Sequence, residues 1–298
     1  RILSSAASDV YKRQHISVMP TEVIENLIHS KSGDYLDCTF GVGGHSKKIL
    51  ENLNNDGSLN SIDKDPKVFK FVNQIKDKRF EFKNISFSDI NNFFPPSSFD
   101  GILMDLGISS FQLDDSSRGF SFQTDSSLDM RINQSSGFTA YEWLNQAKEK
   151  EIADVFFYLG EERKSRSLAR QIVENRKIKK ISSTSDLSNL YFHNNRSKKH
   201  PATNIFRAVR MFINDEIEEL ISALKSSISL LKKGGRLVVI SFHSIEDRIV
   251  KNFLKGKLEN IKLDTFLDPV GKIIKPSIEE TKSNPRSRSA IMRVGKKS

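Results

Sequence analysis

The sequence predicts an α/β protein with a largely parallel sheet, interrupted by a mainly helical insert. From residue 35 to residue 107, β-prone runs alternate with helical stretches, which is the pattern of βαβ units. From Ser109 to about Asn214 the sequence is rich in turns and then helical, without a convincing strand, and the alternation resumes afterwards. We therefore expect a discontinuous domain, residues 15–109 and 214–298, and an inserted helical domain, residues 110–213.

The first half of the predicted sheet contains four strands separated by a glycine turn and helices. The turn GVGG leads into a helix that begins at His45. A second helix is predicted over residues 65–77, because Asp65 is a good N-cap and Pro66 suits the first helical position. Its apolar residues, among them Val68 and Ile75, recur at helical spacing. The strands are predicted at residues 35–40, 57–63, 80–86 and 99–107.

In the insert, Thr139 and Glu142 form a capping-box pattern, and residues 151–176 predict a helix with an interruption near Gly160. The sheet then continues. Apolar residues between 217 and 228 form a helical stripe that ends at Gly234 and Gly235, and RLVVISF predicts the fifth strand. Ser244, with Asp247 three residues later, predicts the cap of a further helix. Residues 288–294 predict a last strand, for which an antiparallel orientation is open.

The first fourteen residues, RILSSAASDVYKRQ, show neither a helical nor a strand period. They also lack the apolar run of roughly 7–15 residues that a signal peptide contains. We expect residues 1–14 to be a foreign or disordered leader outside both domains.

The composition of the 298-residue chain excludes several protein classes. Its single cysteine, Cys38, excludes an internal disulfide framework and a cysteine-based zinc site. The six histidines show no spacing typical of metal ligands, so no metal is expected. Apolar runs such as LVVI are far shorter than the roughly 20 residues that span a membrane. We expect a cytoplasmic protein without a membrane partner.

The charge is strongly basic, since 47 Lys and Arg residues face 37 Asp and Glu residues, a formal net charge of +10. Such a protein often binds nucleic acid, although a lysine-rich solvated surface has the same composition. The clearest basic stripe is Arg163, Arg166 and Arg170, at helical spacing within the insert. A helix that only faces solvent would show the same spacing of charges, but we favour binding of the RNA backbone for part of the basic residues. The other residues of this set are Arg196, Lys198, Lys199, His200, Arg207, Arg210, Arg286 and Arg288.

The glycine-rich segment DCTFGVGGHS is the most informative motif of the chain. A glycine turn between a first strand and its helix lets a ligand approach the backbone beside exposed helix N–H groups. The glycines are Gly41, Gly43 and Gly44, so the third glycine of a dinucleotide fingerprint is missing. An ordinary tight connection would need the same residues.

Polar or aromatic residues end three further strands, where open α/β sheets bind their ligands. Asp63 ends the second strand about 20 residues after the turn, a position from which a carboxylate can accept both ribose hydroxyls. Phe87 follows the third strand, where it could stack on a purine; a core phenylalanine fits that spacing equally well. Asp105 ends the apolar fourth strand, and burying its carboxylate unpaired would be costly, so we expect it to point into the crevice.

Seven motifs together resemble the MraW/RsmH family. They run in the family's order from about His15 to Val294: TFGVGGHS, DLGISSFQLDDSSRGFSF, LDMR, LGEER, HPATNIFRAVR, ISFHSIEDRIVK and NPRSRSA. The resemblance implies a class I methyltransferase fold of Rossmann-like topology, with S-adenosyl-L-methionine as cofactor. It also implies methylation of the N4 amine of a cytidine in small-subunit (16S) ribosomal RNA. The insert would be the domain that recognises this substrate.

The resemblance also implies site residues. Gly43, Gly44 and His45 would lie on the cofactor, Asp63 would hold its ribose, Phe87 would contact its adenine, and Asp105 and Gln112 would complete the site. Three positions depart from the family pattern. Phe111 stands where proline is usual, Arg207 where glutamine is usual, and Ser127 where proline precedes LDMR. Because Phe111 adjoins Gln112, the contact inferred for Gln112 is the one most affected.

For the chemistry, Asp105 is placed to accept a proton from the cytosine amine, with a ribose or methionine contact as the alternative role. Phe242 and His243 follow the fifth strand and could stack on and hydrogen-bond the base, or could belong to the core. Three other functions stay open. They are a nicotinamide-dependent oxidoreductase, a non-catalytic RNA-binding factor, and a methyltransferase acting on DNA or protein. Nothing in the sequence indicates an oligomeric state.

Overall fold

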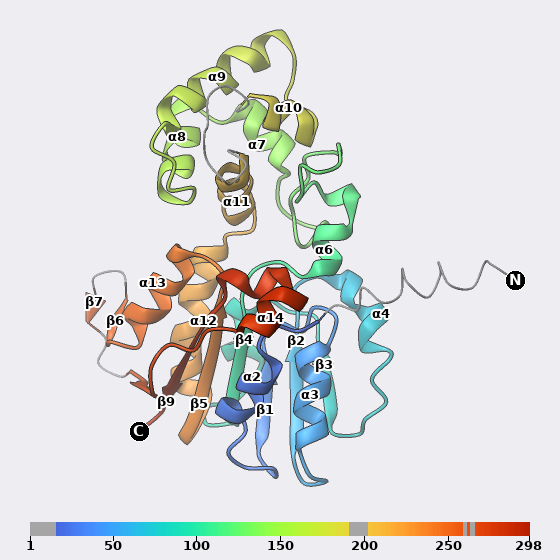
Figure 1. Ribbon diagram of the computed structural model, residues 1–298, viewed down its shortest axis with the longest axis vertical. Coiled ribbons are helices and arrows are strands. Elements are labelled where there is room, and N and C mark those ends of the chain that lie inside the picture. The colour runs from blue at the N-terminus through green and yellow to red at the C-terminus, as the bar shows by residue number, and fades with distance from the viewer. Residues whose placement is uncertain (1–15, 191–201, 259–260, 263–265) are drawn as a thin grey trace, which may run out of the picture. The chain divides into compact units, whose positions relative to one another are not determined.

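The computed structural model describes residues 16–190, 202–258, 261–262 and 266–298, and the chain forms two compact units (Figure 1). The first unit comprises residues 1–107 and 221–298, and the second comprises residues 108–220. Residues 1–14, expected to be a leader, lie outside the described residues. So do the basic residues of the segment 191–201.

The first unit is built on a seven-stranded sheet in the order β3-β2-β1-β4-β5-β9-β8. Strands β1 to β5 pair in parallel, and β9 pairs antiparallel with β5, which settles the orientation of the last strand. The predicted α/β class, with the strand arrangement of a class I methyltransferase, is confirmed. The strands are β1 (Asp34–Asp37), β2 (Ser58–Ile62), β3 (Phe80–Lys83), β4 (Phe99–Asp105), β5 (Leu231–Ser241), β8 (Asp268–Pro269) and β9 (Ile291–Lys296). A separate hairpin joins β6 (Lys257–Leu258) and β7 (Ile261–Lys262).

The central strands are apolar on both sides, which is what a parallel sheet covered by helices requires. In β4, Leu103 belongs to the core cluster that also contains Val23 and Ile49, from the helices on one face. Its neighbours Ile102 and Met104 point to the other face and are also fully buried. Both faces of the sheet are therefore shielded from water.

Helices α2 (Pro20–Leu27) and α3 (Gly44–Asn52) contact each other and lie in front of the sheet in the view of Figure 1. Helix α5 (Ile90–Phe93) is joined to α12 (Glu216–Leu230) by a hydrogen bond from Ser229 Oγ to Asn91 Oδ1 of 2.9 Å. The remaining elements of this unit are η1 (Pro66–Val68), α4 (Phe69–Val72), η2 (Phe87–Asp89), α13 (Ser244–Phe253), α14 (Ile278–Ser283) and η4 (Pro285–Ser289).

The helix predicted over residues 65–77 is only partly correct. The side chain of Asp65 accepts from the backbone N–H of Lys67, so the predicted cap is confirmed. The helical stretch ends at Val72, and beyond Asn73 the N–H groups of Gln74 and Ile75 bond only three residues back. Only Val68 of its apolar residues is buried, so packing does little to extend the helix.

Two other local predictions are wrong. Helix α13 is capped by His243, whose side chain accepts from the N–H of Glu246, and not by Ser244. Asp247, the presumed partner in that cap, is instead held by the guanidinium of Arg293 on β9, at 2.8 and 3.0 Å. Likewise, β5 already begins at Leu231 and runs through the glycine pair, where its register with β4 shifts.

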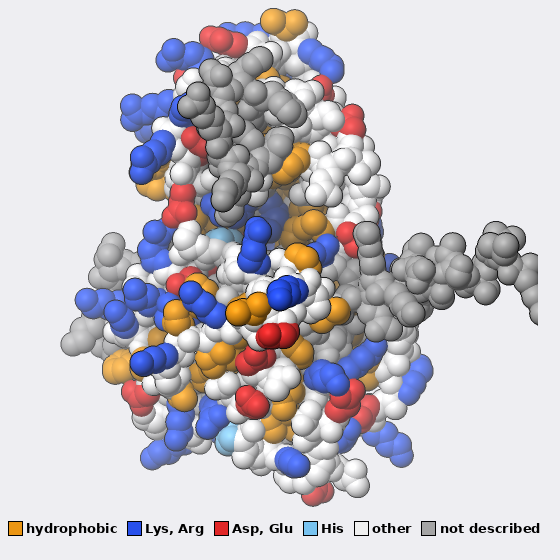
Figure 2. Space-filling view, viewed as in Figure 1, with side chains coloured by type: hydrophobic (Ala, Val, Ile, Leu, Met, Phe, Trp, Pro, Cys, Tyr) orange, Lys and Arg blue, Asp and Glu red, His pale blue; other side chains and the backbone are white. Residues whose placement is uncertain are grey.

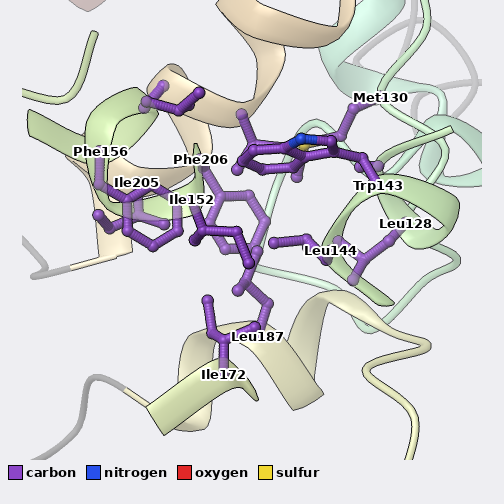
Figure 3. Packing of buried hydrophobic residues seen from close by; sticks show 14 of the residues in the cluster. Leu128, Met130, Trp143, Leu144, Ile152, Phe156, Ile172, Leu187, Ile205 and Phe206 are labelled. Carbon is purple, nitrogen blue, oxygen red and sulfur yellow. The ribbon is translucent and has the colours of Figure 1, made fainter. Parts of the chain in front are cut away.

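The second unit consists of helices around its own apolar core. Figure 3 shows Trp143, Leu144, Ile152, Phe156 and Phe206 converging on this core. The predicted capping box at Thr139 is confirmed, and the long predicted helix is interrupted near Gly160 as expected. The helices are α6 (Ser110–Asp114), η3 (Ser116–Arg118), α7 (Ala140–Gln146), α8 (Glu149–Tyr158), α9 (Ser165–Ile178), α10 (Thr184–Asn189) and α11 (Ala202–Ile213).

A buried arginine organises the turn-rich start of this unit. The side chain of Arg118 is fully buried, donates to the carbonyl of Ile132 at 2.8 Å, and pairs with Asp115 at 3.1 Å. Gly119 follows with a positive φ of 70°, and a Cβ there would lie 2.1 Å from the carbonyl oxygen of Ser127. Only glycine fits this close approach.

In the described part of the chain, no helix combines the length and apolar character needed to cross a bilayer.

Candidate functional site

The carboxyl ends of parallel strands β1, β2 and β4 bring several polar residues of the first unit to one edge of the sheet. Asp37 ends β1, Asp63 follows β2, and Asp105 ends β4. Since β1 is paired with both β2 and β4, these carboxylates stand on adjacent strand ends. The edge is the usual ligand-binding side of an open α/β sheet.

The turn between β1 and α3 is shaped by its glycines. Gly41 and Gly43 have positive φ values of 55° and 80°, and Gly43 is the N-cap of α3 without a side-chain cap. A Cβ on Gly43 would lie 2.8 Å from the ring of Phe40, and one on Gly44 would lie 2.1 Å from Ser17 Oγ. The two glycines therefore let the ring of Phe40 and the hydroxyl of Ser17 pack closely against the turn, and the first N–H groups of α3 are left without a side-chain cap, which suits an anionic or polar ligand.

The carboxylate of Asp63 is held beside this turn. Its Oδ2 accepts from the N–H of Gly41 at 2.8 Å, and its Oδ1 accepts from the N–H of Asp65 at 2.9 Å. Burial raises the pKa of Asp63 to about 6, although both hydrogen bonds oppose the shift. A carboxylate oxygen can accept a second hydrogen bond, so both oxygens keep capacity for a hydroxyl donor.

His45, in the first turn of α3, lies against Asp105. Its Nε2 is 3.3 Å from Asp105 Oδ2, and the two side chains are 6% and 21% exposed. Burial opposes the charged imidazole, but the adjacent Asp105 carboxylate outweighs it and raises the pKa of His45. Among the described residues, both ring nitrogens of His45 and Oδ1 of Asp105 are buried without a hydrogen-bond partner. Buried polar atoms of this kind are usually satisfied by a ligand or by water.

The sequence did not lead us to predict Asp37 as a site residue, although its carboxylate connects several residues at this edge of the sheet. Its Oδ2 accepts from Ser46 Oγ at 2.7 Å, and its Oδ1 accepts from the N–H of Thr39 at 3.0 Å. Thr39 Oγ1 in turn accepts from the N–H of Asp105 at 2.8 Å. Burial raises the pKa of Asp37. The signal was present, because Asp37 opens the glycine motif at the end of a strand.

Two predicted site residues are not brought to this edge by a described contact. Phe87 begins η2 and is half-buried, after Ser86, which caps that turn. Gln112 belongs to the second unit, where its side chain completes the capping box of α6 by accepting from the N–H of Ser109 at 2.8 Å. Their expected cofactor contacts stay predictions.

The end of β5 carries the other predicted base-binding residues. A Cβ on Gly107 would lie 3.8 Å from the ring of Phe242, so this ring lies beside the chain just after the end of β4. His243 Nδ1 accepts from the N–H of Glu246 at 3.4 Å, while Nε2 lies 3.1 Å from Glu246 Oε1. The imidazole is therefore held as a helix cap, which fits the structural alternative for His243.

The basic residues of the second unit differ in whether their side chains are bound within the fold or exposed to solvent. Arg210 is bound to Glu216 at 2.7 and 2.8 Å, and Arg207 donates to the carbonyl of Gly160 at 3.2 Å. Arg163 and Arg166 are exposed, and Arg170 is 69% exposed although it lies 3.7 Å from Glu149. Arg166 and Arg170 on α9 thus present their charges to solvent, as does Arg163 in the loop before this helix, and the predicted helical stripe is only partly formed, whereas Arg210 serves the fold.

No metal site is formed by the described residues, among which no group of three His, Cys, Asp or Glu side chains is suitably placed. Cys38 is buried.

Comparison with known proteins identifies the family. The model of the MraW methylase family matches residues 12–298. "Ribosomal RNA small subunit methyltransferase H" of Buchnera aphidicola subsp. Acyrthosiphon pisum (strain APS) is 43% identical over 302 residues, covering 94% of this chain and 97% of that protein. The protein of the same name from Rickettsia conorii (strain ATCC VR-613 / Malish 7) is 43% identical over 304 residues, covering 95% and 98%. A solved structure, a putative rRNA-methylase from Clostridium thermocellum, has a TM-score of 0.45 and 11% identity, covering 94% of this chain and 95% of that one. The chain belongs to the MraW methylase family.

Proposed function

We propose that this protein transfers a methyl group from S-adenosyl-L-methionine to the N4 amine of a cytidine in small-subunit (16S) ribosomal RNA. Its family and the names of its relatives support methylation of ribosomal RNA. The observation that carries the finer assignment is Asp105, a carboxylate at the end of β4 with one oxygen buried and without a donor among the described residues. Such an acceptor suits an amine that must lose a proton.

The residues at the sheet edge fit the cofactor. Gly43 begins α3 without a side-chain cap, and Asp63 supplies carboxylate oxygens for ribose hydroxyls. His45 Nδ1, which has no hydrogen-bond partner among the described residues, adds a polar atom to the same turn. We propose that these residues hold S-adenosyl-L-methionine with Gly44, and that Phe87, Asp105 and Gln112 complete the site. When bound, the cofactor supplies a methyl group on a sulfonium, from which a neutral thioether can leave.

The acceptor is the harder partner. The lone pair on the cytosine amine is delocalised into the ring, so the nitrogen is a weak nucleophile. A carboxylate that accepts a hydrogen bond from this N–H raises the electron density on nitrogen. As the new N–C bond forms, one N–H bond breaks and its proton goes to Asp105. The backbone N–H of Asp105 donates to Thr39 Oγ1, and the side chain of Asp105 is positioned by His45.

We also propose that residues 110–213 recognise the substrate, because this part of the chain has its own core and carries the exposed cations of α9. A base must leave its stack before the methyl group can reach it, and this costs least for an unpaired nucleotide. The proposed partner is therefore an accessible strand of ribosomal RNA.

The proposed function is tested by incubating the protein with methyl-labelled S-adenosyl-L-methionine and small ribosomal subunits that lack the modification, followed by nucleoside analysis. We expect the label in N4-methylcytidine. Parallel reactions with DNA and with ribosomal protein test the alternative acceptors. Label in another nucleoside, or only in DNA or protein, would overturn the proposal.

A further inference from the structure

Helix α8 ends in two aromatic residues that its core does not use. Phe156 is fully buried, whereas Phe157 and Tyr158 are 52% and 68% exposed. The two exposed rings pack edge to face, with their centroids 5.1 Å apart. Adjacent exposed rings are uncommon on a surface that faces only water, and they mark a site of interaction.

The loop after these rings has a built conformation. The N–H of Glu162 donates to the carbonyl of Phe156 at 3.1 Å, and Glu162 Oε1 accepts from the N–H of Lys164 at 2.8 Å. A Cβ on Gly160 would lie 2.5 Å from the same Phe156 carbonyl oxygen, so only glycine fits at this position. Arg207 donates to the carbonyl of Gly160 from α11. The rings are thus presented by an ordered support, and the charge of Glu162 is engaged in the loop.

The chain that follows is strongly basic, because residues 163–180 contain eight Lys and Arg and one acid, Glu174. Some of these cations serve the fold: Arg176 donates to the carbonyls of Leu144 and Ala147, and Lys179 pairs with Asp186. The three that follow the rings most closely in the chain, Arg163, Lys164 and Arg166, are all exposed. Figure 2 shows Lys and Arg side chains, with hydrophobic surface next to them, at the upper left, where Figure 1 places α8 and α9.

We propose that this surface, the α8–α9 platform, binds unpaired nucleotides of the ribosomal RNA substrate. It consists of Phe157, Tyr158, Arg163, Lys164 and Arg166. Bases stack on the two rings, and the neighbouring phosphates pair with the cations. The combination favours a nucleic acid, because aromatic rings interleaved with cations match the alternation of bases and phosphates in a single strand. This inference rests on the proposed function for the identity of the RNA.

The test compares variants in equilibrium binding to two probes, protein-free 16S ribosomal RNA and intact small subunits that lack the modification. Phe157→Ala and Tyr158→Ala should each weaken binding of both probes by about 5- to 100-fold, the range of a lost stacking contact. Tyr158→Phe keeps the ring and should bind nearly as the wild type. Ile178→Ala is the matched control, since Ile178 is 90% exposed but lies at the far end of α9.

The cations are tested by salt dependence. The double variant Arg163→Ala, Arg166→Ala should weaken binding and lower the slope of log affinity against log salt by roughly 1 to 2. Binding of S-adenosylhomocysteine should not change in any of these variants, which shows that the cofactor site is intact. Lys225→Ala, which removes an exposed cation from α12, should leave the affinity close to that of the wild type.

Three outcomes would overturn the platform. One is unchanged affinity for both probes after removal of either ring. Another is a loss of affinity for intact subunits alone, which would assign the surface to a ribosomal protein. The third is a wild type that binds neither probe. Since binding is measured without methylation, a wild type that binds RNA but forms no N4-methylcytidine would instead overturn the proposed function and leave the platform standing.

Discussion

Asp63 combines two properties that a ribose-binding carboxylate needs. Backbone N–H groups of Gly41 and Asp65 fix its orientation, and the side chain is partly buried beside the glycine turn. The same burial makes the ionised form costly, which is why the pKa of Asp63 rises to about 6. Below that pH, the ionised form of Asp63, which can bind a ribose hydroxyl, is therefore less populated than the protonated form in the free protein.

This predicts a pH dependence of cofactor binding. As the pH falls through about 6, Asp63 gains a proton, and a protonated oxygen no longer accepts freely from a ribose hydroxyl. The affinity for S-adenosylhomocysteine, measured by titration calorimetry, should decrease between pH 7 and pH 5. Asp63→Asn should bind more weakly at pH 7 and lose most of this change. An Asp63→Asn protein with the wild-type pH profile would assign the titration to another group, such as His45.

Asp105 gives a second test at the scale of one residue. Asp105→Asn keeps the shape of the side chain but removes the proton acceptor. If Asp105 takes the amine proton, kcat at saturating cofactor and RNA should fall by about 100- to 10,000-fold. The affinity for S-adenosylhomocysteine should change much less. A near-normal kcat with weakened cofactor binding would instead give Asp105 the ribose or methionine contact.

At the scale of elements, α3 is anchored at the end opposite the glycine turn. The guanidinium of Arg79, just before β3, donates to the carbonyls of Leu50, Leu53 and Asn54, at 2.9, 2.8 and 3.1 Å. Asp77 holds that guanidinium at 2.6 Å. The hydrogen bonds from Arg79 lower the pKa of Asp77 to about 2. One side chain thus satisfies the open carbonyls at the end of α3 and ties the helix to the sheet.

Arg79→Ala should therefore destabilise the protein. Three carbonyl acceptors lose a charged donor, and such bonds contribute about 1.5–3 kcal/mol when the donor is removed. We expect a loss of about 1–3 kcal/mol in the free energy of unfolding, measured by urea denaturation at pH 7. Lys48→Ala is the control, because Lys48 only pairs with Glu51 on the surface of the same helix and should change stability by about 0.5 kcal/mol or less. Equal stability of Arg79→Ala and wild type would refute the anchoring role.

Local sequence signals succeeded where the interaction partner was near in the chain. Asp65 and Thr139 cap their helices as predicted, since each needs only a backbone N–H two or three residues away. Ser244 does not cap α13, because the helix begins one residue earlier: His243 accepts from the N–H of Glu246, and the N–H of Asp247 donates to the carbonyl of His243.

At the scale of the whole molecule, the chain has ten more Lys and Arg than Asp and Glu residues, so internal ion pairs cannot engage all of its cations. Arg79, Arg131, Arg210 and Arg293 are bound to acids within the fold, whereas exposed cations gather on α9. When the exposed cations bind phosphates, counterions are released from the RNA, so these cations set the salt dependence of RNA binding.

The affinity for small ribosomal subunits should consequently fall steeply with salt. If six to ten phosphates are contacted, raising the salt from about 50 to about 200 mM should weaken binding on the order of 10³- to 10⁵-fold. The measurement is an equilibrium titration at each salt concentration, with S-adenosylhomocysteine binding as the reference that should change little. An affinity unchanged over this range would mean that the basic surface is only solvated.

By itself, the sequence determined the order of strands and helices, the glycine turn and the acidic strand ends, because period, turn residues and caps are properties of neighbouring residues. Only the tertiary structure decided that Asp37 orients the turn, that His45 meets Asp105, and that Arg210 is consumed by Glu216. It also decided that Phe157 and Tyr158 point away from the core although Phe156 enters it. Each of these depends on which side chains from distant or competing positions meet once the chain has folded, and no local pattern encodes that choice.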